Sequence, residues 1–298
     1  MKISTAVKDY LVEIEIRKYS DRTIETAKSK LKMFTNYCAE ELDTIDIEDV
    51  TPQIVKRYTQ HLTKRGLKGT TINGTLKTLK SFIQYCYEEE YGGFNTKRGG
   101  FKYVKQEKPI IRAFTRRDIK LILDNCKGMD YLATRDTAFL TLLFETGVRC
   151  SEARNIRYAD IKEDYILING KGSKQRVVPI TPILKKAMLR YERTADSYFL
   201  NKNIDDVYFL SRNGKKLNNS AVLHMMRRRG KGIKDIRVSP HTCRHFFAQQ
   251  QVKMGTDLYT ISRLLGHENI AITQIYLNSL RNEDLIKITK GNSVLMNM

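Results

Sequence analysis

The chain has 298 residues, a length that allows two ordinary domains, each with a core of its own. Lysine and arginine outnumber aspartate and glutamate by 53 to 33, which gives a formal net charge of +20 and a pI near 9.7. This charge predicts a polyanionic partner, most simply nucleic acid, with a solvated basic surface or an anionic membrane as alternatives. Because no apolar run reaches the roughly 18–20 residues that span a bilayer, and the first residues do not lead into a signal peptide, we expect no membrane partner.

Five cysteines are spread widely along the chain and form no Cys-x-x-Cys pair. This spacing disfavours a disulfide framework and a zinc knuckle. We therefore expect reduced thiols, a cytoplasmic protein and no bound metal.

The first hundred residues contain four stretches in which apolar residues recur at helical spacing. Ser20 or Asp21 is placed to cap the second helix, and Pro52 stands just inside the first turn of a third. A fourth helix is expected to begin near Gly69. The pattern predicts a four-helix domain over residues 1–95.

A basic segment with two glycines and interleaved aromatic residues follows at residues 97–105. We interpret residues 96–112 as an interdomain linker that runs near DNA, with Lys102 and Lys105 as candidate DNA contacts. An ordinary flexible loop fits the same pattern equally well.

The remaining residues, 113–298, predict a larger and mostly helical domain. Residues 138–144 indicate a buried helix that ends near Gly147. Two β-rich runs, residues 165–169 and 176–180, predict a hairpin whose turn lies between them. The expected fold is therefore mainly α, with one small β-hairpin.

Two arginines and a histidine are candidates for holding a phosphate. His241 and Arg244 are three residues apart, a spacing that puts both side chains on one helix face. The planar guanidinium matches two phosphate oxygens, and Arg149 offers a second one. Cations around a phosphoryl group stabilise the charge of its transition state. The alternative for Arg149 is a salt bridge to Glu145 or Glu152.

A zinc site is the alternative for the histidines, because His241 and His245 have the four-residue spacing of a zinc helix. A metalloprotease helix needs glutamate at the next position, which is Thr242 in this chain. No other ligand cluster calls for a metal, so we expect none.

Lys171 lies between two glycines at the expected hairpin tip. A lysine there can protonate a departing sugar oxygen, and general-acid help typically contributes about 10²–10⁴-fold. The alternative is a solvated turn lysine. The loop lacks the spacing of a nucleotide-binding P-loop, so we expect no ATP cofactor.

Tyr276 is a candidate nucleophile, although the chain has 16 tyrosines and most tyrosines are core or surface aromatics. A phenol has a pKa near about 10 and needs help to attack at neutral pH. The arginines, Lys171, His241 and His267 around one phosphate would supply it. A phosphotyrosine bond keeps the energy of the broken phosphodiester, so strands can be rejoined without a cofactor.

Weaker signals point to further DNA contacts. Residues 227–231 form a charge run that is usually a solvated face but can bind backbone phosphates. Residues 256–266 resemble half of a helix-turn-helix, which alone would indicate a transcriptional regulator. The candidate DNA contacts in this domain are Lys174, Arg176, Arg227 and Arg228.

Together these motifs resemble the tyrosine recombinase (phage integrase) family in order, approximate spacing and flanking residues. The resemblance is carried by residues 146–152, 170–179, 239–246, 264–268 and 273–276. The N-terminal helices resemble, more weakly, the family's core-binding domain. The compact chain is similar to Xer-type recombinases or to integrases of mobile elements.

The resemblance implies a clamp around duplex DNA and a set of catalytic roles. Tyr276 would form a 3′-phosphotyrosine, and Lys171 would protonate the leaving 5′-oxygen. The scissile phosphate would be held and activated by Arg149, Arg244, His241 and His267.

The resemblance also implies an assembly in which four protomers exchange strands through a Holliday junction. We expect a monomer or weak oligomer without DNA, and accessory proteins are possible partners. Leu280, Leu285, Ile286 and Ile288 predict an amphipathic tail that docks on a neighbouring protomer. A non-catalytic DNA-binding regulator and a type IB topoisomerase remain alternatives. The motifs fit integration, excision, transposition and dimer resolution alike.

Overall fold

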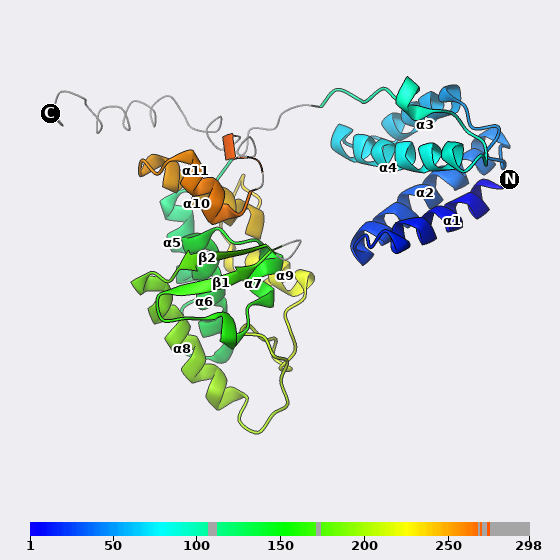
Figure 1. Ribbon diagram of the computed structural model, residues 1–298. Coiled ribbons are helices and arrows are strands. Elements are labelled where there is room, and N and C mark those ends of the chain that lie inside the picture. The colour runs from blue at the N-terminus through cyan, green and yellow to red at the C-terminus, as the bar shows by residue number, and fades with distance from the viewer. Residues whose placement is uncertain (107–111, 171–173, 268, 270–272, 275–298) are drawn as a thin grey trace, which may run out of the picture. The chain divides into compact units, whose positions relative to one another are not determined.

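A computed structural model describes residues 1–106, 112–170, 174–267, 269 and 273–274. The chain divides into two compact units, Met1–Pro109 and Ile110–Met298, each with its own core (Figure 1). Lys171, Tyr276 and the tail predicted to dock on a neighbour lie outside the described residues. Of the helices described, none is both long and apolar enough to cross a membrane.

Residues 1–106 contain four α-helices, as the apolar periodicity predicted. Ser20 caps the second helix by accepting a hydrogen bond from the backbone N–H of Thr23, and Pro52 lies in the first turn of the third. The apolar stripes meet in a core in which the rings of Phe34 and Tyr58 lie 5.1 Å apart, edge to face. The helices are α1 (Ile3–Ile16), α2 (Asp21–Leu42), α3 (Pro52–Lys64) and α4 (Gly69–Glu88).

The segment after α4 packs against the bundle through residue 106, whereas we expected a linker from residue 96. It contains the short helix η1 (Thr96–Arg98). The buried Asn73 side chain of α4 donates to the Val104 carbonyl and accepts from the Val104 N–H, both at 2.8 Å. This side chain satisfies an extended backbone that would otherwise need water. The Lys102 and Lys105 side chains are exposed on this packed segment.

The described part of the C-terminal unit is mainly helical with one two-stranded antiparallel sheet, as predicted. Ile168 lies opposite Arg176 in the hairpin, and the described strands end on either side of residues 171–173. The elements are α5 (Arg116–Asp124), α6 (Tyr131–Thr146), α7 (Cys150–Asn155), η2 (Tyr158–Asp160), β1 (Tyr165–Asn169), β2 (Gln175–Pro179), α8 (Pro182–Tyr198), α9 (Asn219–Arg229), α10 (Pro240–Lys253) and α11 (Leu258–Leu265).

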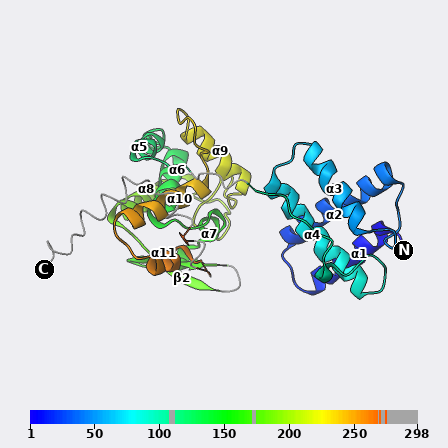
Figure 2. The same ribbon diagram turned by 90° about the horizontal axis from the view of Figure 1, so that it is seen from above.

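Helix α6 runs through the middle of this unit and packs against α8, α10 and α7 (Figure 2). Its apolar residues are buried on every side; Phe139, Leu140 and Leu143, for example, are fully inaccessible. A helix that is apolar all round is stable only inside a core. It ends, as predicted, at Gly147, whose φ of +62° is the left-handed conformation that favours glycine.

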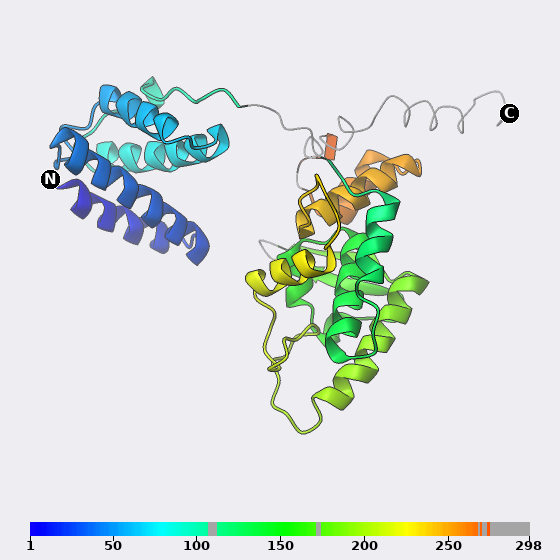
Figure 3. The same ribbon diagram turned by 180° about the vertical axis from the view of Figure 1, so that it is seen from behind.

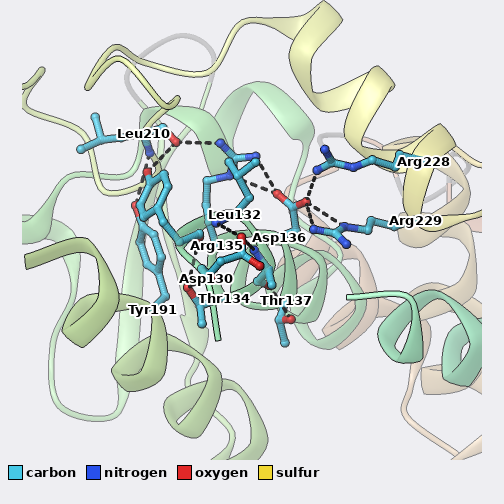
Figure 4. Close-up of polar contacts among 12 residues, drawn as sticks. Asp130, Leu132, Thr134, Arg135, Asp136, Thr137, Tyr191, Leu210, Arg228 and Arg229 are labelled. Carbon is cyan, nitrogen blue, oxygen red and sulfur yellow. Dashed lines mark hydrogen bonds and ion pairs between the residues drawn. The ribbon is translucent and has the colours of Figure 1, made fainter. Parts of the chain in front are cut away.

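Part of the arginine run at the end of α9, the yellow helix in Figure 3, holds the fold together. Arg228 and Arg229 both donate to one carboxylate oxygen of Asp136, a fully buried residue of α6, at 2.7 and 2.8 Å (Figure 4). Arg135 donates to the other oxygen. Three guanidinium groups thus compensate one buried carboxylate and connect α9 to α6.

The geometry of Gly147 generates a prediction for stability. A Cβ added to Gly147 would lie 2.5 Å from Cδ1 of Phe247. A Cβ added to Gly255, which has a φ of +83°, would meet no atom within 4 Å. Left-handed backbone costs a non-glycine residue about 1–2 kcal/mol. Gly255→Ala should therefore lose about that much stability in urea unfolding, and Gly147→Ala clearly more. Equal losses would contradict the steric argument.

Candidate active site

The C-terminal end of α11 gathers three arginines around one short turn. The last carbonyls of a helix have no partner within the helix, and they carry the negative end of its dipole. Here three successive carbonyls each accept a hydrogen bond from a different arginine. These pairs are Leu264 with Nε of Arg176 at 2.8 Å, Leu265 with Nη2 of Arg244 at 2.8 Å, and Gly266 with Nη2 of Arg149 at 3.0 Å.

Arg244 lies between the C-terminal ends of two helices. It comes from α10, is only 4% exposed, and its Nη1 donates to the carbonyl of Gly147, where α6 ends. Its Nη2 also lies 2.7 Å from Nε2 of His267. The helix predicted from the His-x-x-Arg spacing therefore places this guanidinium at the centre of the cluster.

Arg149 is the residue that caps the N-terminus of α7, and 44% of its side chain is exposed. Its Nη1 donates to Glu152 at 2.9 Å, and its backbone N–H donates to the other oxygen of the same carboxylate at 2.8 Å. The salt bridge that we weighed as an alternative is present. It orients the guanidinium while part of the group remains open to an anion.

Glu152 and Arg176 form a second layer beneath Arg149. Arg176 donates to both carboxylate oxygens of Glu152, at 3.1 and 2.7 Å, and its side chain is 13% exposed. Burial alone would raise the pKa of Glu152, but the hydrogen bond and charge of Arg176, followed by those of Arg149, more than offset it, so the pKa is lowered. Arg176, which we expected to face DNA, is directed into the protein.

His267 follows directly after this turn and is neutral at pH 7. Its Nδ1 lies 2.9 Å from Oγ1 of Thr273, which is fully buried. A guanidinium only donates, so Nε2 accepts from Arg244 and the ring proton is assigned to Nδ1. Burial, followed by the charges of Arg244, Arg149 and Arg176, lowers the pKa of His267 to about 4.

His241 lies on α10 one turn before Arg244, and its side chain is exposed at an open cavity of about 640 Å³ that Cys150 also lines. Its ring packs edge to face on His245, with centroids 4.3 Å apart. Burial and then neighbouring positive charge lower the pKa of His241. Within the described residues, no three His, Cys, Asp or Glu side chains are grouped to hold a metal ion.

The structure thus brings together Arg149, Arg244 and His267, with His241 on the same helix as Arg244. Lys174 is exposed one residue before β2, and Arg227 is exposed on α9. Sequence reasoning named Glu152 as an alternative salt-bridge partner of Arg149, but it missed the contact of Glu152 with Arg176 and that of Thr273 with His267. Glu152 had a detectable signal, because a glutamate three residues after a helix cap is the pattern of a capping box.

Two family profiles match the chain. The profile described as "Phage integrase family" matches residues 112–283, and the one described as "Phage integrase, N-terminal SAM-like domain" matches residues 7–90.

Among curated proteins, the chain is similar to Tyrosine recombinase XerD of Halalkalibacterium halodurans, with 27% identity over 87% of this chain and 88% of the relative. It is 28% identical to Tyrosine recombinase XerC of Thermodesulfovibrio yellowstonii, over 91% and 90% of the two chains.

Two solved structures show the same fold. One is the XerH site-specific recombinase bound to palindromic difH substrate in a post-cleavage complex, with a TM-score of 0.75, 17% identity, and coverage of 94% of this chain and 82% of that one. The other is a lambda integrase dimer bound to a COC′ core site, with a TM-score of 0.75, 16% identity, and coverage of 95% and 97%.

Two histidines with lowered pKa values, His245 and His267, predict how stability depends on pH. Burial first, and then His241 and Arg244, lower the pKa of His245 from its ordinary 6.5 to about 4, the same value as for His267. As the pH falls from 6.5 to 4, the unfolded chain binds protons at these positions and the folded chain does not. The free energy of unfolding should therefore decrease over this window and remain at its full value above it.

Urea unfolding between pH 7.5 and 4 tests this, with His245→Asn as a variant that does not titrate at that position. The variant should show a shallower loss of stability towards acid than the wild type. A wild-type stability that does not change between pH 6.5 and 4 would contradict the assignment of neutral imidazoles at His245 and His267.

Proposed function

This chain belongs to the phage integrase family, and from that membership we propose that it is a site-specific DNA recombinase that cleaves and rejoins strands through a 3′-phosphotyrosine. The observation that carries the proposal is the convergence of Arg149, Arg244 and His267 on the end of α11. Such a cluster favours a dianionic transition state over a neutral ligand, because positive charge set in place before the reaction needs no reorganisation during it.

In the proposed reaction, Arg149 and Arg244 bind the non-bridging oxygens of the scissile phosphate. The partial exposure of Arg149 gives the phosphate access to one guanidinium, while Arg244 approaches it from the buried side. His241 and His267 are neutral, so they add hydrogen-bonding capacity without adding repulsive charge to a cationic site. Tyr276 attacks phosphorus, and Lys171 protonates the 5′-oxygen that leaves.

The proposed partner is duplex DNA, held in a clamp as the family resemblance implies, with exposed Lys102, Lys105, Lys174 and Arg227 near its backbone. A net charge of +20 supports a phosphate-rich partner. By the family resemblance, four protomers would assemble on two synapsed sites, with the tail of one protomer docked on the next. The five cysteines are free thiols, which is compatible with a reducing cytoplasm.

Covalent trapping tests the chemistry. The protein is mixed with DNA that flanks its own coding region, nicked so that cleavage releases a short fragment and religation fails. The mixture is then denatured. We expect a protein–DNA adduct with the wild type and none with Tyr276→Phe, which removes only the phenolic oxygen. Peptide mapping of the adduct should place the nucleotide on Tyr276.

The other outcomes discriminate among the alternatives. An adduct on a different tyrosine would contradict the assigned nucleophile. Relaxation of supercoiled DNA without exchange between two sites would favour a topoisomerase. Tight binding to a site, with no adduct on any substrate that carries it, would favour a non-catalytic regulator.

The arginine run of α9 predicts a graded series in DNA binding and stability. Arg227→Gln should reduce the salt dependence of DNA binding by about 0.9 in the log–log slope, the value for one phosphate contact, and leave stability unchanged. Arg229→Gln, whose side chain is 14% exposed and bound to Asp136, should instead lose about 1–3 kcal/mol of stability. Arg228, 51% exposed and bound to the same carboxylate, should show part of both effects.

Filter binding at several salt concentrations and urea unfolding measure the two properties. The assignment fails if Arg227→Gln leaves the salt slope unchanged, or if Arg229→Gln is as stable as the wild type.

A further inference from the structure

The inward direction of Arg176 points to a role that differs from a DNA contact. We propose that Arg176 is a positioning residue of the active site, an inference that rests on the proposed recombinase function. It fixes Glu152 and the end of α11 relative to each other, so that Arg149 and His267 are oriented before DNA binds.

The first part of the argument is the pairing of Arg176 with Glu152. Both η nitrogens donate to the carboxylate, one to each oxygen, and Glu152 is only 6% exposed. The same two oxygens accept from the side chain and the backbone N–H of Arg149. Any movement of Arg176 would therefore shift the carboxylate that orients Arg149.

The second part is the contact of Arg176 with the end of α11. Its Nε donates to the carbonyl of Leu264, and a Cβ on Gly266 would lie 3.0 Å from its Nη1. Gly266 thus packs its bare Cα face on the guanidinium, in a left-handed conformation with φ of +67°. His267 is the next residue, so the position of the Arg176 guanidinium also fixes the backbone from which the His267 side chain extends.

The third part is the position of Arg176 in the hairpin. It lies on β2 opposite Ile168, and a Cβ on Gly170, one residue after β1, would lie 3.9 Å from Oε1 of Glu152. The turn end of the hairpin, the start of α7 and the end of α11 therefore meet at one guanidinium. The hairpin is thereby connected to the groups proposed to bind the phosphate.

The geometry requires arginine in particular. The Nε, Nη1 and Nη2 atoms of this one planar group donate three hydrogen bonds in different directions, to Leu264 and to the two oxygens of Glu152. A lysine ammonium could reach Glu152 but could not also hold the Leu264 carbonyl in the same plane. All three of these donors are bonded within the protein, two to Glu152 and one to Leu264.

The test compares Arg176→Gln, Arg176→Lys and the wild-type chain, with Arg193→Gln as a control for loss of an exposed arginine on α8. The rate of covalent cleavage is measured at saturating DNA, and the DNA dissociation constant is measured across salt concentrations. We expect Arg176→Gln to lower the rate on the order of 100-fold, as a displacement of about 1 Å in a catalytic group can do. The salt slope should stay unchanged, and Arg176→Lys should lie between Gln and wild type.

A second arm uses no DNA, so it separates a failure of this inference from a failure of the proposed function. The pKa of His267 is measured by NMR in the DNA-free protein. It should rise in Arg176→Gln, because the charge of Arg176 contributes to its depression after burial, Arg244 and Arg149. The charged groups that lower this pKa are Arg244 on α10, Arg149 at the start of α7 and Arg176 on β2. Arg193 on α8 is not among them, so Arg193→Gln should leave the pKa of His267 unchanged.

The inference would be overturned by any of three results. One is a cleavage rate of Arg176→Gln or Arg176→Lys equal to that of the wild type at saturating DNA. Another is a salt slope lowered by about 0.9 with an unchanged saturating rate, which would make Arg176 a phosphate contact. The third is an unchanged pKa of His267 in Arg176→Gln. If the Gln variant does not fold, the cleavage rate and salt slope of the Lys variant decide the outcome.

Discussion

The carbonyl end of α11 is the feature on which the proposed active site depends. Three arginines whose side chains meet at one turn repel each other, and they stay together only if negative charge lies between them. Three helix carbonyls and the buried carboxylate of Glu152 supply it. Because these partners belong to the protein, the positive cluster is assembled without DNA, and little ordering is left for the binding step.

The core of the C-terminal unit places this turn. Helix α6 is buried on all sides and ends at Gly147, whose carbonyl binds Arg244. The packing of Phe247 leaves no room for a side chain at Gly147, which brings α10 close to the end of α6. The arrangement of Arg244 is therefore set by core packing rather than by a flexible loop, which favours a precise site.

Much of the fold could be predicted because its signals are local. The four N-terminal helices, the buried helix ending at Gly147 and the hairpin follow from periodicity and capping residues. The packing of residues 96–106 could not be predicted, because its partner Asn73 is distant in sequence. The inward direction of Arg176 was missed, although strand alternation indicated it. Arg176 and the fully buried Val178 are two residues apart, and so lie on the same face of β2.

The candidate site shows the same division. The i, i+3 spacing of His241 and Arg244 could be read from the sequence because it is local, and α10 contains both residues. The contacts of Arg149 with Gly266 and of Arg176 with Glu152 depend on how distant segments pack, so only the structure could give them.

Hydrogen exchange in the DNA-free protein tests most directly the central claim, that the site is assembled before DNA binds. The amides of Arg149 and His267, which donate to Glu152 and to Ser262, should be protected before DNA is added. Fast exchange that slows only on DNA binding would show instead that DNA assembles the site.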